Sequence, residues 1–368
     1  MSRSLIEIVG DIEDPRKGNA IRHNLTEVLT IALLAVLCDC TRFTEMELFG
    51  IEREEWLRSF LTLENGIPSH DTFGDIFAAI DPEQMRLCLI EWTDSIREKI
   101  REEVIAIDGK SIRGSKSVSE GKRAIHVVSA WAAENGIVLG EVATDEKSNE
   151  ITAIPKLLRM LKLNGCIITI DAMGTQKEIT TVIQECGADY VLPVKENHPG
   201  LLDNIALYFS TEKATCDYAK TVEKSHGRYE KRECWATENI SWLPNRECWS
   251  GLSGIAMIRS TIQRDISGDP EYATHYLLFS KTGMTASQIL QVKRRHWSIE
   301  NCLHWVLDVD FGEDAMRMRV GNAAENMNIF RHVALNLLKL ESSYKGSLNL
   351  KRKKCILSPT YLLKVFSS

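Results

Sequence analysis

Two aspartates, Asp108 and Asp171, each follow a short apolar run that is rich in β-branched residues. The runs cover 104–107 and 166–170, and each predicts a buried strand that carries a charged side chain to the rim of a sheet. Glu300 lies far downstream in a stretch with helical spacing. Two strand-borne carboxylates and a helical glutamate offer the hard oxygen donors that suit magnesium or manganese, and paired ions of this type serve phosphoryl transfer.

The pair of aspartates is more informative than either residue alone, because a single aspartate at a strand end usually caps a turn or a helix. The predicted strand order makes their two strands neighbours, so both side chains are expected at one edge of the sheet. Two carboxylates that close repel each other unless one is protonated or a cation lies between them. We therefore predict that Asp108, Asp171 and Glu300 bind divalent metal, as two magnesium or manganese ions.

The histidines around Glu300 leave two further interpretations of this helix. His296 and His304 lie four residues before and after the glutamate, so the three side chains share one helical face. Such a stripe is either a zinc site, which needs a further ligand that the sequence does not show, or a face with solvated or hydrogen-bonded histidines.

A second acidic group follows Glu300. Asp308 lies two helical turns beyond it and is an alternative third ligand. Otherwise the group caps the end of the helix or holds the arginines that follow. The acidic residues are Asp308, Asp310, Glu313 and Asp314, and the arginines are Arg317 and Arg319.

The region from about residue 101 to residue 194 has the periodicity of a mixed sheet. Asn135-Gly136 is a strong hairpin signal between two of its strands. The order is three antiparallel strands followed by parallel strands with crossover helices, which is the order of a ribonuclease-H-like domain. Strands are predicted at 103–108, 124–133, 137–143, 166–171 and 189–194, and helices at 149–163 and 175–186.

The rest of the chain is predicted to flank this sheet. The fold class is thus α/β: a ribonuclease-H-like mixed sheet with flanking helices and a β-rich insertion, preceded by a small helical N-terminal domain. The expected parts are a helical domain at 1–100, a catalytic domain at 101–340 with the insertion at about 196–284, and a basic C-terminal tail at 341–368. Within them, helices are predicted at 25–37, 45–60, 285–308 and 322–340, with two more that begin near Ser69 and at Pro82.

Composition is that of an ordinary soluble globular protein, with 44% hydrophobic and 26% charged residues among 368. The longest apolar stretch, 28–38, is too short to span a membrane, and the N-terminus lacks the apolar core of a signal peptide. Ten cysteines without paired metal spacing favour free thiols in a reducing compartment. We expect a cytoplasmic protein without a membrane partner.

Charge is distributed unevenly along the chain. The formal net charge is −6 overall, −9 over residues 1–100, −4 over 101–280 and +7 over 281–368. The acidic N-terminal helices therefore suit a packing or assembly role at least as well as a DNA-reading helix-turn-helix. The C-terminal part is the side expected to face phosphates, although a solvated basic helix and tail has the same composition. Its clusters are 293–295, Arg317 with Arg319, and 351–354.

Four separated motifs resemble those of the H-repeat-associated proteins, bacterial insertion-sequence transposases with an Asp-Asp-Glu active site. The motifs keep the family's order and lie at 66–73, 106–114, 169–176 and 296–311. The resemblance implies a ribonuclease-H-like core that is interrupted by a β-rich insertion before the glutamate helix. It places the family's three acidic residues at Asp108, Asp171 and Glu300.

The resemblance also implies partners and chemistry. Such an enzyme cuts phosphodiesters at the ends of its element with two metal ions and joins the freed 3′-hydroxyls to target DNA. Double-stranded DNA is thus the expected partner, with a homodimer on DNA as a plausible assembly. Related transposases carry Tyr, Arg and Lys at −7, −4 and +7 from the glutamate, where this chain has Lys293, His296 and Leu307.

Several residues near the predicted sheet edge and the glutamate helix are expected to contact DNA. Trp297 and Trp305 could stack on an unpaired end base, although core packing is the more common role of such tryptophans. A lysine directly after a catalytic strand could contact the scissile phosphate, although most lysines simply lie on the surface. The predicted DNA contacts are Lys110, Arg113, Lys195, Lys293, Arg294, Arg295, His296 and Trp297.

Two other classes of function share these features. A degenerate or domesticated copy would bind DNA without cutting it. A metal-dependent nuclease would cut DNA without strand transfer.

Overall fold

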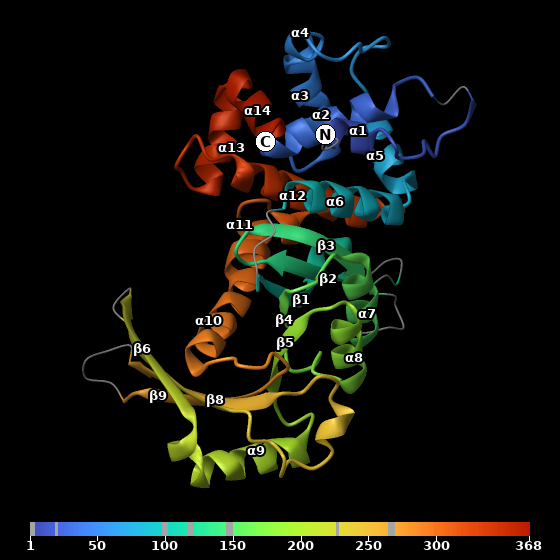
Figure 1. Cartoon of the computed structure of the whole chain (residues 1–368). Coiled ribbons are helices and arrows are strands. Elements are labelled where there is room, and N and C mark those ends of the chain that lie inside the picture. The colour runs from blue at the N-terminus through green and yellow to red at the C-terminus, as the bar shows by residue number, and fades with distance from the viewer. Residues whose placement is uncertain are drawn as a thin grey trace.

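The computed structural model describes residues 4–18, 21–97, 102–116, 121, 123–144, 150–225, 228–263 and 269–368. Over these residues the chain forms a nine-stranded mixed sheet with helices on both faces, and a helical part at one end that is built from both the N-terminal and the C-terminal segments (Figure 1). None of the described helices is long and apolar enough to cross a membrane. The ten cysteines are free thiols.

The N-terminal part is helical, as predicted. Its helices begin where side chains can satisfy free backbone amides: Asn24 accepts from Glu27, Ser69 from Thr72 and Asp81 from Glu83. The helix predicted at 45–60 is divided into two. The helices are Leu5–Val9 (α1), Leu25–Leu37 (α2), Phe43–Glu52 (α3), Glu54–Leu57 (α4), His70–Ala79 (α5) and Pro82–Ile96 (α6).

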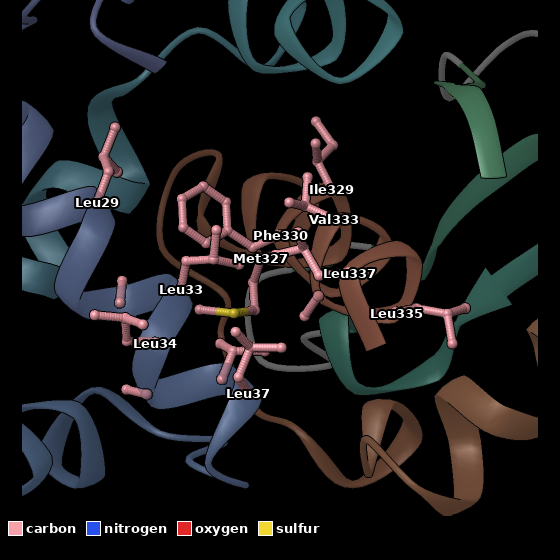
Figure 2. Packing of buried hydrophobic residues seen from close by; sticks show 14 of the residues in the cluster. Leu29, Leu33, Leu34, Leu37, Met327, Ile329, Phe330, Val333, Leu335 and Leu337 are labelled. Atoms are coloured by element: carbon pink, nitrogen blue, oxygen red, sulfur yellow. The ribbon is translucent and has the colours of Figure 1, made fainter. Parts of the chain in front are cut away.

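The core of this part forms between α2 and Ala323–Leu340 (α12), which are far apart in the sequence. Both helices are buried around most of their circumference, as expected of helices that are covered on several sides. Figure 2 shows leucines of α2 lying toward Met327, Phe330 and Leu337 of α12. The side-chain amide of Asn336 pairs with the backbone of Val138 at both the N–H and the C=O, so α12 also covers an edge of the sheet.

The segment predicted as a basic tail at 341–368 instead forms two packed helices, Leu348–Leu357 (α13) and Pro359–Phe366 (α14). They lie against α12, with α14 also against α2 (Figure 1). Lys351 donates to the Leu338 carbonyl at 2.7 Å, and Arg352 donates to the Val36 carbonyl at 2.9 Å. Both side chains are buried and donate hydrogen bonds to backbone carbonyls near the C-terminal ends of α12 and α2. The expectation that the whole 351–354 cluster faces phosphates is therefore wrong.

The sheet has the strand order β3-β2-β1-β4-β5-β9-β8-β7-β6. β1 pairs with β4 and β4 with β5 in parallel, and the other pairs are antiparallel. The predicted adjacency of the two aspartate-bearing strands is therefore confirmed. The strands are Val104–Ile112 (β1), Ile125–Ala132 (β2), Ile137–Ala143 (β3), Ile167–Thr169 (β4), Asp189–Val194 (β5), Asp217–Ser225 (β6), Arg228–Thr237 (β7), Gly254–Gln263 (β8) and Glu271–Phe279 (β9).

The β-rich insertion extends this sheet. Its last strand, β9, pairs antiparallel with β5, and β8, β7 and β6 follow outward (Figure 1). Pro199–Thr211 (α9) precedes these strands along the chain. The insertion thus continues the sheet of β1 to β5 without a break in hydrogen bonding.

Helices cover the two faces of the sheet. Glu150–Met160 (α7) and Lys177–Glu185 (α8) pack on the face where Ile105 and Ile107 point, while Ala286–His296 (α10) packs on the face of Val104. The helix predicted at 285–308 is interrupted. After α10 comes a π-helical turn, Glu300–His304 (η5), and then Trp305–Val309 (α11).

Candidate metal centre

Asp108 lies inside β1, not at its end as predicted. β1 runs on to Ile112 against β2, but its parallel partner β4 accompanies it only as far as the pair Ala106–Thr169. Side chains alternate along a strand, so Asp108 shares the face of Ala106, which packs with Leu303 and Phe311. The carboxylate therefore projects where β4 has stopped, on the face that η5 and α11 cover.

Asp171 follows β4 by two residues, in the turn that leads to α8. Its Oδ1 accepts a hydrogen bond from the Gly174 amide at 2.9 Å, which fixes the turn. The charge of Asp171 raises the pKa of Asp108, so the two carboxylates lie within electrostatic reach of each other, as the strand order predicts. Asp171 also lies within electrostatic reach of Lys293 on α10.

Glu300 and His304 are the two ends of the π-helical turn. The Trp305 amide donates to the Glu300 carbonyl, which is the wider i to i+5 bond of a π-helix. Nδ1 of His304 lies 3.2 Å from Oε2 of Glu300 and 3.6 Å from Oδ2 of Asp108. The Glu300 side chain is 57% exposed whereas that of His304 is 6% exposed, so the glutamate opens to solvent above a buried imidazole.

These three side chains form a compact set of donors. Asp108, Glu300 and His304 each offer one ligand atom, and the three atoms lie within 4.8 Å of one another. Sequence reasoning noticed His304 only as part of a zinc stripe with His296. The structure separates the two histidines, because Nδ1 of His296 lies 3.0 Å from the Thr169 hydroxyl. The one signal that could have pointed to His304 was its i+4 spacing from Glu300.

The electrostatics of this set favour a cation. The pKa of Asp108 is raised to about 7, chiefly by burial and also by the charges of Glu150, Asp171 and Glu300, against a lowering hydrogen bond from the Gly109 amide. Burial lowers the pKa of His304, although Glu300 opposes this shift. A divalent cation would supply the positive charge that the clustered carboxylates lack.

The opposite face of β1 carries a second histidine–glutamate pair, which the sequence analysis missed. Nε2 of His126 lies 2.7 Å from Oε1 of Glu150, and its Nδ1 lies 3.0 Å from the Ser111 hydroxyl. Gly109 makes room for this pair: a Cβ there would lie 2.2 Å from Oε1 of Glu150 and 2.5 Å from Nε2 of His126. Glu150 thus sits behind Asp108 across the sheet and contributes to its raised pKa.

The residues predicted to contact DNA fall into three groups, and Lys110 belongs to the internally paired one. Its ammonium pairs with Glu313 and lies 2.5 Å from Oδ1 of Asp308. Asp308 therefore serves Lys110 and does not replace Glu300 in the donor set. Another member of the acidic group, Asp314, lies 3.6 Å from Nε of Arg113.

The exposed group includes Arg113, whose side chain is 81% exposed. Arg294 pairs with Glu223 of β6 but stays exposed, and Arg295 lies 2.5 Å from Glu134. Trp297 and Trp305 are 58% and 55% exposed, so the core-packing interpretation is wrong for both. They flank η5 in the sequence.

Near Asp171, Lys195 and Lys293 form a third positive group with His275. Lys195 is exposed and Lys293 is partly buried. Burial lowers the pKa of Lys293, and the charge of Lys195 lowers it further while Asp171 raises it. The same two lysines lower the pKa of His275, after the larger effect of its burial.

Comparison with known proteins identifies the class of protein that carries this site. The family model described as "Transposase DDE domain" matches residues 99–337, and the model "DDE_Tnp_1-associated" matches residues 6–93. The chain belongs to the Transposase DDE domain family. Family membership supports a transposase function and a DNA-cutting enzyme in general terms, and the family uses divalent metal.

Full-length relatives agree with this assignment. The chain is 40% identical to "Putative transposase YncI" of Escherichia coli O157:H7, over 100% of this chain and 95% of that protein. It is 36% identical to "H repeat-associated putative transposase YhhI" of Escherichia coli strain K12, over 99% and 98% of the two chains. The resemblance to H-repeat-associated proteins is thereby confirmed.

A solved structure of a piggyBac transposase synaptic complex with hairpin DNA is similar over 98% of this chain and 77% of that chain, with a TM-score of 0.45 and 11% sequence identity.

Proposed function

We propose that this chain is a DNA transposase that cuts phosphodiesters at the ends of its own element and joins the freed 3′-hydroxyls to target DNA. In this proposal Asp108, Asp171 and Glu300 hold divalent magnesium or manganese. The observation that carries it is the convergence of the Asp108 and Glu300 carboxylates beside His304, within electrostatic reach of Asp171. Phosphoryl transfer needs such a site, because charge develops on the attacking and leaving oxygens.

The strand order supports a ribonuclease-H-like core for this site. Three antiparallel strands, β3-β2-β1, are followed by the parallel strands β4 and β5. This order brings Asp108 and Asp171 to adjoining strands, and α10 with η5 brings Glu300 over the same face. The insertion lies between β5 and α10 in the sequence, as the resemblance implies.

Each part of the site has a proposed task. When bound, divalent cations lower the pKa of an attacking water and stabilise the leaving 3′-oxygen. The carboxylates of Asp108, Asp171 and Glu300 fix the position of that charge. The exposed Glu300 leaves the site open to a DNA strand from the solvent side, whereas the sheet closes the other side.

Exposed cations and aromatic rings around the site are proposed to hold the DNA. Arg113, Lys195 and Arg294 are placed to contact phosphates, which would make binding strongly dependent on salt. Lys293, Arg295 and His296 lie on α10, the helix that also carries Arg294. Trp297 is proposed to stack on a base near the cut, since its ring is open to solvent. We also propose that two copies pair the two element ends on the bacterial chromosome.

The decisive test is incubation of the purified protein with its flanking inverted repeats and Mg²⁺ or Mn²⁺, with resolution of nicks, hairpins and joined products. We expect cleavage and joining by the native chain. Asp108→Asn, Asp171→Asn and Glu300→Gln should each abolish cleavage while gel-shift binding persists. Glu178→Gln, an exposed carboxylate on α8, is the matched control and should cleave normally.

Each other result of this experiment contradicts a specific part of the proposal. Undiminished cleavage by one of the three variants removes that residue from the site. Binding without cleavage by the native chain identifies a degenerate copy. Cleavage without joined products identifies a nuclease that lacks strand transfer.

A further inference from the structure

The π-helical turn makes His304 a candidate ligand in its own right. In a regular α-helix residues at i and i+4 share a face. The wider π-helical turn at η5 alters the relative directions of the Glu300 and His304 side chains, which stand at its two ends. Nδ1 of His304 lies beside both carboxylates, at 3.2 Å from Glu300 and 3.6 Å from Asp108. Extra-wide turns of this kind occur frequently at functional sites.

Burial leaves His304 one nitrogen for this site. The residue is 5% exposed, and its Nε2 is buried without a hydrogen-bond partner among the described residues. Only Nδ1 reaches the space between Asp108 and Glu300. A buried imidazole whose one accessible ring nitrogen lies beside two carboxylates is placed to act as a nitrogen donor for a cation.

Neighbouring charges do not oppose a cation at this position. Lys110 and His332 both lower the pKa of His304. Lys110 is paired with Asp308 and Glu313, and Nδ1 of His332 lies 2.7 Å from Oε2 of Glu141. Asp171, by contrast, lies within reach of Lys293, and it falls outside the compact donor set. The two aspartates therefore meet different surroundings on the same face of the sheet.

We propose that Nδ1 of His304 is a ligand of the metal ion held by Asp108 and Glu300, and that this mixed nitrogen–oxygen site binds Mn²⁺ more tightly than Mg²⁺. Imidazole is a poor ligand for Mg²⁺, which demands oxygen donors in near-ideal octahedral geometry, and a better one for transition metals. Asp171, which lies outside this donor set, would then hold mainly a second ion, and the two ions would be bound unequally. This inference rests on the proposed metal-dependent function.

The test is Mn²⁺ binding to the full-length protein without DNA, followed by electron paramagnetic resonance. Electron spin-echo envelope modulation reports directly whether a ¹⁴N nucleus coordinates the ion. We expect a histidine ¹⁴N coupling in the native protein and its loss in His304→Ala. In His304→Ala we also expect the Kd of the more tightly bound Mn²⁺ to rise. Loss of an outer-shell partner costs roughly 10–100-fold in metal affinity, and loss of a direct ligand should cost at least as much. The change in the Kd for Mg²⁺ should be smaller.

A donor swap keeps the proposal testable if His304→Ala fails to fold. His304→Asn places an amide oxygen near the position of Nδ1, so it should retain metal binding, lose the ¹⁴N coupling and discriminate less between Mn²⁺ and Mg²⁺. His296→Gln is the matched control one helical turn before Glu300, and it should keep the native ¹⁴N coupling.

The outcomes separate the inference from the proposed function. An absent ¹⁴N coupling in the native protein, or one that survives in both His304 variants, overturns the inference even if the protein cleaves DNA. A ¹⁴N coupling that disappears with His304, in a protein that never cleaves its repeats, leaves the inference standing and overturns the proposed function.

Discussion

Two histidine–glutamate pairs flank β1, one on each face. On the α7 face, His126 lies 2.7 Å from Glu150 and also contacts Ser111 at 3.0 Å. On the α11 face, His304 lies 3.2 Å from Glu300 and 3.6 Å from Asp108. The residue types are the same, but the first pair uses both ring nitrogens within the protein, and the second directs one nitrogen at two carboxylates.

This difference shows that donor availability, rather than residue type, separates a structural pair from a candidate site. In the His126–Glu150 pair, the Ser111 hydroxyl contacts the second ring nitrogen of His126, and Gly109 leaves room for the two side chains. The His304–Glu300 pair is open to solvent through Glu300 and adjoins the strongly perturbed Asp108. The same comparison explains why the pKa of Asp108 is raised by charges on both faces of the sheet, Glu150 on one and Glu300 on the other.

The largest expected difference between the two faces is in activity. Glu300→Gln should reduce metal-dependent cleavage of the repeats by more than the roughly 10–100-fold that loss of an outer-shell group costs. Glu150→Gln, the same change on the other face, should stay within a few-fold of the native rate. Single-turnover cleavage assays measure both. Equal losses would show that Glu150 belongs to the reacting site and would erase the distinction.

Stability should move in the opposite direction from activity at Asp108. Its folded pKa of about 7 exceeds the ordinary 3.8, so the folded state retains a proton that the unfolded state loses, and stability falls as pH rises from about 4 to 7. Asp108→Asn removes this penalty. We expect the metal-free variant to be more stable than the native protein at pH 8, by on the order of 1–4 kcal/mol.

Urea unfolding at pH 8 and at pH 4 with a metal chelator present checks this prediction. The gain should largely disappear at pH 4, where the carboxyl is protonated in the folded state and close to its ordinary pKa of 3.8 in the unfolded state. A variant less stable than the native chain at pH 8 would show that Asp108 is stabilised as an anion.

Gly109→Ala tests the closed pair. The new methyl group would meet Oε1 of Glu150 and Nε2 of His126 at less than van der Waals distance, so the pair must separate. We expect a loss of about 1–3 kcal/mol in unfolding free energy, as for other overpacked sites. Thermal unfolding of Gly109→Ala alone and in a Glu150→Ala background measures it. The loss should shrink in the double variant, and an unchanged loss would place the clash elsewhere.

The smallest expected effect is a pH shift from Glu150→Gln. The negative charge of Glu150 raises the pKa of Asp108, so a neutral glutamine should lower it. Protons compete with metal for Asp108, and the midpoint of Mn²⁺ binding against pH should therefore move to lower pH. Titration calorimetry across pH 5–8 follows this midpoint. An upward or absent shift would show that Glu150 is not charged behind Asp108.

Local sequence determined much of the fold. The apolar runs before Asp108 and Asp171 produced buried strands, and the Asn135-Gly136 turn joined β2 to β3 as an antiparallel pair. Cap residues such as Asn24 set helix starts in the N-terminal part. These features follow from backbone propensity and periodicity within a few residues, so they are legible without the rest of the chain.

The sequence by itself also brought Asp108, Asp171 and Glu300 together as one hypothesis, and their role as ligands stays a prediction. Only the tertiary structure decided which neighbours those side chains meet. In the folded chain Lys110 pairs with Glu313, and Arg352 is buried against backbone carbonyls. His304 lies beside Glu300, whereas His296 contacts Thr169. The physical reason is that hydrogen bonds, ion pairs and burial depend on segments that lie far apart in the chain, which no local pattern records.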